Sequence, residues 1–207
     1  MCQTVDYYFS PQSPWAYLGH ARFVAMARDA RAAVRVMPVD LGGRVFSRSG
    51  GLALGQRAPQ RQAYRLLELK RYSDYLDAPL HQQPTYFPVS GDDASRLIIA
   101  ADLQLGSAAA LAITGSILAA VWAQQRNIAD ESVLLQLLQE CGLSADLLEQ
   151  SHRQATQERY EENTQAAIDA GVFGAPSYVI EGEIFWGQDR LDFVQRKLLP
   201  TERRLQV

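Results

Sequence analysis

The first forty residues most constrain the fold, because they read as a strand, a helix and a second strand in succession. The β-rich run at 5–10 (VDYYFS) is stopped by Pro11 and predicts a buried strand. Ser13 is a favoured helix N-cap and Pro14 suits the first helical position, so a helix is expected to follow. The stretch 31–41 alternates in part and predicts the second strand. Such a unit implies two parallel strands joined by a right-handed crossover.

The carboxy-terminal part of the chain returns to β-structure. Apolar runs at 178–180 and 184–186 flank the tight turn Glu181-Gly182, which is a hairpin signal. A last helix is expected to open at 187–189. Its apolar face would hold Leu191, Val194 and Leu198.

The middle of the chain is predicted to be helical. A Gly/Ser/Arg-rich stretch at 42–58 has no periodic pattern and predicts a surface loop, and the prolines within 81–91 predict a break. The expected helices begin at Pro59 and then cover 92–103, 107–126, 132–141 and 144–170. We therefore expect an α/β fold: a thioredoxin-like domain, residues 1–41 and 171–207, whose β-α-β and β-β-α halves are separated by a large all-helical insertion, residues 42–170.

Composition excludes several classes of function. A net charge of −3 does not suggest a nucleic-acid partner or an anionic-membrane partner. No signal-peptide pattern or membrane-spanning run is evident, so a cytoplasmic location is expected. The two cysteines, Cys2 and Cys141, and three scattered histidines predict neither a disulfide framework nor a metal site.

The segment Ser13-Pro14-Trp15-Ala16 is the first candidate for chemistry. In thioredoxin-like proteins a Cys-x-x-Cys motif stands here, because the helix N-terminus stabilises a thiolate. A serine cannot exchange disulfides, but its hydroxyl can donate a hydrogen bond to the thiolate of a bound thiol. The alternative is that Ser13 only caps the helix.

Two later segments are further candidates. A cis bond between Ala175 and Pro176 would turn the Ala175 backbone toward a peptide-like ligand, whereas a trans proline would simply begin the strand. In Trp186-Gly187-Gln188-Asp189, backbone N–H groups could hold a carboxylate and Asp189 an ammonium group. Asp189 is otherwise an ordinary first-turn acid of a surface helix.

The motifs DYYFSPQSPWAYLGH, GVFGAPS and FWGQDRLDFV together resemble the glutathione-dependent 2-hydroxychromene-2-carboxylate isomerases, relatives of kappa-class glutathione transferases and DsbA-type oxidoreductases. The resemblance implies a glutathione cofactor whose thiolate is a transient nucleophile, an aromatic carboxylate substrate and a homodimer. It implies that Ser13 is catalytic and lies beside the glutathione sulfur. It also implies that Ala175 and Pro176 bind the cysteinyl unit, and that the segment 186–189 binds the γ-glutamyl end.

The substrate-binding half departs from that family's pattern. The family lysine falls at Val45 or Phe46, and its Asn-Arg pair falls at Gln60-Arg61, so only Arg61 is kept. Arg44 or Arg48 could replace the lysine. The aromatic residues that could wall the pocket are Trp15, Phe46, Tyr64, Tyr86 and Phe87. Because of this departure, a kappa-like transferase or peroxidase and a non-catalytic glutathione-binding protein stay open as alternatives.

Overall fold

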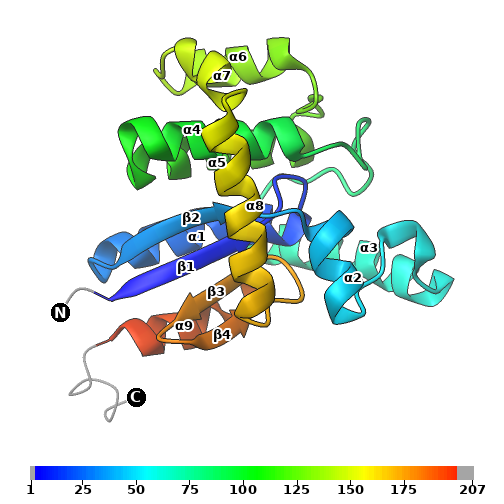
Figure 1. Cartoon of the computed structure of the whole chain (residues 1–207). Helices are drawn as coiled ribbons and strands as arrows, with labels where there is room; N and C mark the ends of the chain where they lie inside the picture. Colours follow the sequence, from blue (N-terminus) through cyan, green and yellow to red (C-terminus); the bar gives the residue numbers. More distant parts are fainter. Residues whose placement is uncertain (1–2, 200–207) are drawn as a thin grey trace.

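A four-stranded sheet organises the molecule in the computed structural model, which describes residues 3–199. The strands β1 (Thr4–Phe9), β2 (Ala33–Pro38), β3 (Ser177–Ile180) and β4 (Glu183–Trp186) lie in the order β2-β1-β3-β4 (Figure 1). β1 pairs in parallel with β2 and antiparallel with β3, and β3 and β4 form a hairpin. The expected thioredoxin-like arrangement of a β-α-β and a β-β-α half is therefore confirmed.

Side chains of β1 alternate between the two faces of the sheet. Tyr7 and Phe9 pack on the face covered by α1 (Pro14–Asp29) and α9 (Leu191–Leu198), where Phe23 lies 4.7 Å from Tyr7 between ring centroids. Tyr8 packs on the opposite face, which α8 (Gln154–Asp169) crosses (Figure 1). The sheet is thus buried on both faces, which explains why β1 is a nearly continuous apolar run.

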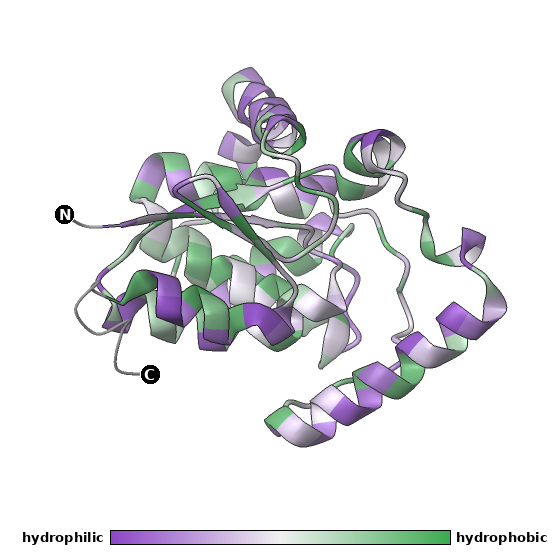
Figure 2. Cartoon of the chain, turned by 90° about the horizontal axis from the view of Figure 1, so that it is seen from below, coloured by the Kyte–Doolittle hydropathy of each residue, from purple (hydrophilic) through white to green (hydrophobic). Residues whose placement is uncertain are grey.

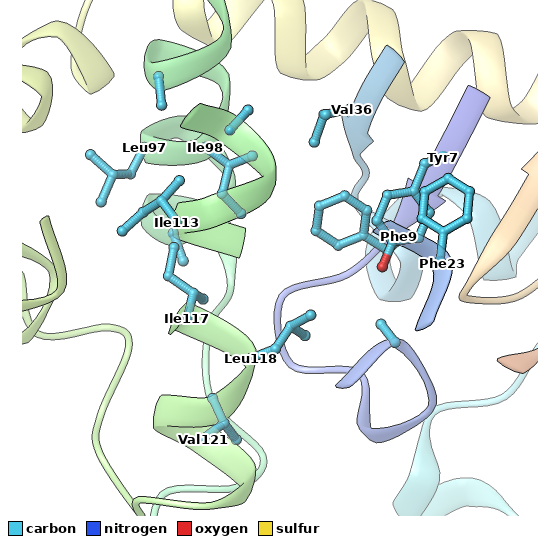
Figure 3. Close-up of a cluster of buried hydrophobic side chains, with 14 of the residues drawn as sticks. Tyr7, Phe9, Phe23, Val36, Leu97, Ile98, Ile113, Ile117, Leu118 and Val121 are labelled. Atoms are coloured by element: carbon cyan, nitrogen blue, oxygen red, sulfur yellow. The ribbon is translucent and has the colours of Figure 1, made fainter. Parts of the chain in front are cut away.

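The remaining helices of six or more residues lie between β2 and β3 in the sequence. They are α3 (Pro59–Leu76), α4 (Asp92–Leu105), α5 (Ser107–Trp122), α6 (Glu131–Glu140) and α7 (Asp146–Ser151). The side chains of α4 and α5 share one core with the sheet and α1 (Figure 3). α5 is apolar around most of its circumference, which is typical of a buried helix. Within residues 3–199, no helix is both long and apolar enough to cross a bilayer.

Two predictions in this middle part were wrong. The stretch 42–58 is not an irregular loop but a series of short turns: a π-helical turn (Leu41–Val45), α2 (Phe46–Ser49) and a 3-10 turn (Leu54–Gln56). Asp40 begins the first turn by accepting a 2.7 Å hydrogen bond from the Gly43 N–H. The predicted helix over 144–170 is two helices, α7 and α8. The division into domains at 1–41 and 171–207 against 42–170 stays a prediction.

The carboxy-terminal hairpin and helix form as predicted. Glu181 (φ 53°) and Gly182 (φ 81°) both adopt left-handed conformations, as the two central residues of a type I′ turn require. A 3-10 turn (Gln188–Arg190) then leads into α9, whose buried face consists of Leu191, Val194 and Leu198.

Candidate active site

Ser13 occupies the amino end of α1, directly after β1. Its Oγ accepts a 3.2 Å hydrogen bond from the Ala16 N–H, so Ser13 is the N-cap, and Pro14 begins the helix. The same hydroxyl donates only a long hydrogen bond, 3.5 Å, to the carbonyl oxygen of Ala175. A bond of this length is weak, so the hydroxyl hydrogen can turn to a better acceptor. Ser13 is therefore a helix cap, and its hydroxyl group can in addition donate a hydrogen bond to a bound anion.

The Ala175–Pro176 peptide bond is cis, which decides between the two alternatives that the sequence left open. The loop that contains it is held by two hydrogen bonds: Ser177 Oγ donates to the Gly174 carbonyl at 2.8 Å, and the Gly187 N–H donates to the Pro176 carbonyl at 2.9 Å. Within residues 3–199, no group accepts a hydrogen bond from the Ala175 N–H. Both backbone groups of Ala175 thus remain available to an extended ligand.

A cavity of about 620 Å³ opens beside Ser13. One part of its wall consists of the start of α1, the turns between Leu41 and Ala58, and α3. The helix α3 lies to one side of the sheet (Figures 1 and 2). The loop 173–175 provides another part of the wall. Six of the predicted site residues line it: Ser13, Trp15, Phe46, Arg61, Ala175 and Trp186. Phe87, also predicted as a wall residue, lines it as well, whereas Tyr64 and Tyr86 do not.

The remaining predicted site residues lie outside this lining: Gln60, Pro176, Gly187, Gln188 and Asp189. Gln188 is turned inward and 2% exposed, because Arg22 of α1 donates to its carbonyl oxygen at 2.7 Å and also to its side-chain Oε1. Asp189 is exposed and forms an ion pair with Arg190 at 2.6 Å. Gln60 is exposed and points from α3 in a different direction from Arg61, since neighbouring helix positions are about 100° apart.

Two arginines that sequence reasoning missed line the cavity together with Arg61. Arg65 follows Arg61 by four residues, a spacing that places both side chains on one helix face and was the signal available in the sequence. Arg57 precedes α3, so helical spacing gave no signal for it. Arg44 and Arg48, the expected replacements for the family lysine, do not line the cavity. Arg44 instead donates to Gln165 at 3.3 Å.

Burial and mutual repulsion act on these cations. Burial, and then the positive charge of Arg61, lower the pKa of Arg57. Burial, and then the charge of Arg57, lower the pKa of Arg65 to about 10, so its guanidinium stays charged at neutral pH. The cavity is therefore a cationic, partly aromatic chamber that suits an aromatic anion. Within residues 3–199, no group of three or more His, Cys, Asp and Glu side chains could hold a metal ion.

Comparison with known proteins agrees with this geometry. The family profile of the DSBA-like thioredoxin domain matches residues 4–199. The chain is 32% identical to the 2-hydroxychromene-2-carboxylate isomerase of Pseudomonas putida over 195 residues, 90% of each chain. It is 28% identical to the enzyme of that name from Sphingobium xenophagum over 96% of this chain and 100% of that one.

Among solved structures, a 2-hydroxychromene-2-carboxylate isomerase superposes with a TM-score of 0.75 at 27% identity and covers 94% of both chains. The sequence and the fold thus point to the same group of proteins. The chain belongs to the DsbA-like thioredoxin family, on the branch of the 2-hydroxychromene-2-carboxylate isomerases, and is an isomerase.

Proposed function

We propose that this isomerase acts on an aromatic carboxylate such as 2-hydroxychromene-2-carboxylate and requires bound glutathione. The observation that carries the proposal is the position of Ser13. Its Oγ lies at the amino end of α1, in the wall of the cavity, and within 3.5 Å of the Ala175 carbonyl. A serine at this position is exposed to the same positive helix end that stabilises the thiolate of a redox cysteine, but the sulfur atom has to come from a bound ligand.

The residues around Ser13 fit glutathione. The unused N–H of Ala175 and its weakly bonded carbonyl oxygen match the backbone of a cysteinyl unit, as an added strand would. Trp186 borders the cavity next to this loop, and Gly187 is tied to it through Pro176. Asp189 would then hold the γ-glutamyl ammonium group. Gln188 would contribute through its backbone, because its side chain is engaged by Arg22.

Bound glutathione would supply a thiolate that adds reversibly to a conjugated double bond and thereby lets it rotate. The task of Ser13 is to donate its hydroxyl hydrogen to the anionic sulfur while Oγ still accepts from Ala16. The positive end of α1 acts in the same direction, since it favours the ionised form of a nearby thiol. The substrate would lie between Trp15, Phe46 and Phe87, with its carboxylate at Arg61.

The comparisons support glutathione through a more distant relative. The chain is 23% identical over 208 residues to human glutathione S-transferase kappa 1. That relative also keeps the alternative of a kappa-like transferase or peroxidase open. The homodimer and the cytoplasmic location remain predictions, and a reducing cytoplasm would keep the cofactor as a free thiol.

Glutathione stoichiometry tests the proposal. The purified enzyme is incubated with substrate and a limiting amount of glutathione, and both are quantified over many turnovers. We expect trans-2-hydroxybenzylidenepyruvate, the ring-opened isomer of 2-hydroxychromene-2-carboxylate, to accumulate while free glutathione stays constant, with no turnover when glutathione is omitted. Loss of one glutathione per product would instead indicate a transferase. Product formation without glutathione would contradict the proposal.

A further inference from the structure

Three guanidinium groups converge on the substrate side of the cavity. Arg61 and Arg65 lie on the same face of α3, one turn apart, and Arg57 precedes the helix by two residues. Arg57 is fixed in place, since its Nε donates to the Leu52 carbonyl at 2.9 Å and its own carbonyl accepts from Gln62 at 2.7 Å. If a substrate carboxylate binds Arg61, the positive charges of Arg57 and Arg65 in the same cavity still have no anionic partner.

The three cations have no acidic partner in the protein. The described residues that line the cavity include no aspartate or glutamate, and no ion pair of Arg57, Arg61 or Arg65 occurs within residues 3–199. Farther along the same helix, by contrast, Arg71 pairs with Glu68 at 2.6 Å. Arg57 and Arg65 are partly buried and Arg61 is exposed at the cavity mouth, so an anion that enters the cavity would offset the mutual repulsion of these cations.

Arg65 is the deepest of the three. Its guanidinium carbon lies 5.2 Å from the Phe87 ring centroid and 5.6 Å from that of Trp122, so two aromatic faces hold it. Phe87 itself lines the cavity. Contacts of this kind use the face of a guanidinium group, so its in-plane N–H donors can still bind a carboxylate.

Resting on the proposed function, we propose that the preferred substrate of this enzyme is an aromatic carboxylate of that kind that carries a second acidic group, and that Arg65 with Arg57 binds this second group while Arg61 binds the first. The substrate class is an aromatic dianion. The axial rise from Arg61 to Arg65 is about 6 Å, comparable with the separation of two carboxylates on one benzene ring. The glutathione residues proposed above, Ala175 and 186–189, come from a different part of the chain and leave this side of the cavity to the substrate.

Calorimetry on the full chain with benzoate and isophthalate tests this inference, each with and without saturating glutathione. We expect isophthalate to bind about tenfold or more tightly than benzoate, and glutathione to leave that preference intact. Arg65→Gln should remove most of the preference, whereas Arg65→Lys should keep part of it. Arg48→Gln, which changes an exposed arginine outside the cavity, should leave the preference unchanged. Arg57→Gln provides a second test should Arg65→Gln fold poorly.

Equal affinity for the two acids would overturn the inference, and so would a preference that survives both Arg65→Gln and Arg57→Gln. Displacement of isophthalate by glutathione would assign these arginines to a glutathione carboxylate and would also overturn it. The two proposals fail separately. Absence of glutathione uptake contradicts the proposed function, whereas the preference for the dianion is measured without glutathione.

Discussion

The hydroxyl of Ser13 lies 3.5 Å from the carbonyl oxygen of Ala175, although 162 positions separate the two residues in the chain. The pairing of β1 with β3, with Tyr8 opposite Ser177, brings them together. The start of α1 and the loop before β3 therefore meet at one edge of the sheet. The proposed thiol site depends on both halves of the fold and on neither alone.

Replacing Ser13 by alanine should reduce turnover about 10- to 100-fold, because a hydrogen bond to a charged group contributes about 1.5–3 kcal/mol. The change also removes a helix cap, which costs about 1 kcal/mol of stability. Asp130→Ala is the matched control, since Asp130 caps α6 by accepting from the Ser132 N–H at 2.9 Å, far from the cavity in sequence and absent from its lining. Equal steady-state rates in Ser13→Ala and Asp130→Ala would show that Ser13 only caps the helix and has no catalytic role.

Asp189→Asn should weaken glutathione binding about tenfold, because it removes the charge proposed for the γ-glutamyl ammonium group. The ion pair with Arg190 at 2.6 Å limits this loss of affinity, since Arg190 already partly neutralises the carboxylate of Asp189. Calorimetry should show a larger effect for this substitution than for S-methylation of the ligand. Asp192→Asn, an exposed acid in the first turn of α9, should bind as the parent does. Parental affinity in Asp189→Asn would rule out the role.

Local signals in the sequence predicted the framework of the site. Ser13 followed by Pro14 is a complete helix start, and Glu181-Gly182 is a complete hairpin turn, so each is determined by its neighbours in the chain. The break between α7 and α8 falls at residues 152–153, which include neither glycine nor proline, and so gave no such signal.

Tertiary contacts decided what the sequence could not show. The side chain of Gln188 turns inward because Arg22, 166 positions earlier, donates to it. The cationic group also depends on context: Arg57 lies outside α3 and joins Arg61 and Arg65 only because the turns before the helix fold back over the cavity. Helical periodicity alone does not report such a fold-back.

His20 should make the protein less stable in mild acid. Burial lowers its pKa from 6.5 to about 4, while its hydrogen bond with the Leu111 carbonyl acts in the opposite direction. Between pH 6.5 and about 4, His20 is protonated in the unfolded chain but stays neutral in the folded chain. The free energy of unfolding therefore decreases as the pH is lowered through this range. The loss should be about 2 kcal/mol at about pH 5 relative to neutral pH.

Urea unfolding of the parent and of His20→Asn at both pH values measures this loss. The variant should be less sensitive to pH, because its residue 20 does not titrate, whereas His81→Asn, which removes an exposed histidine, should behave as the parent does. Identical pH dependence in the parent and in His20→Asn would show that His20 does not carry the effect.

Gly19 is needed where α1 meets the turn before α9. A Cβ at this position would lie 2.9 Å from Gln188 Cβ and 3.1 Å from the Tyr178 hydroxyl. Gly19→Ala should cost about 1–3 kcal/mol of stability and displace the turn that bears Asp189, so glutathione affinity should fall as well. Gly55→Ala, with open space around its Cβ, is the control. Denaturation midpoints that match in the two variants would contradict this packing.

The ultraviolet absorbance of the thiolate, titrated for glutathione bound to the enzyme, tests the central claim most directly. If Ser13 and the positive end of α1 stabilise the anionic sulfur, the bound thiol should ionise with a pKa about one unit or more below that of free glutathione. Most of that shift should vanish in Ser13→Ala. A bound thiol that titrates as it does in solution would contradict the claim.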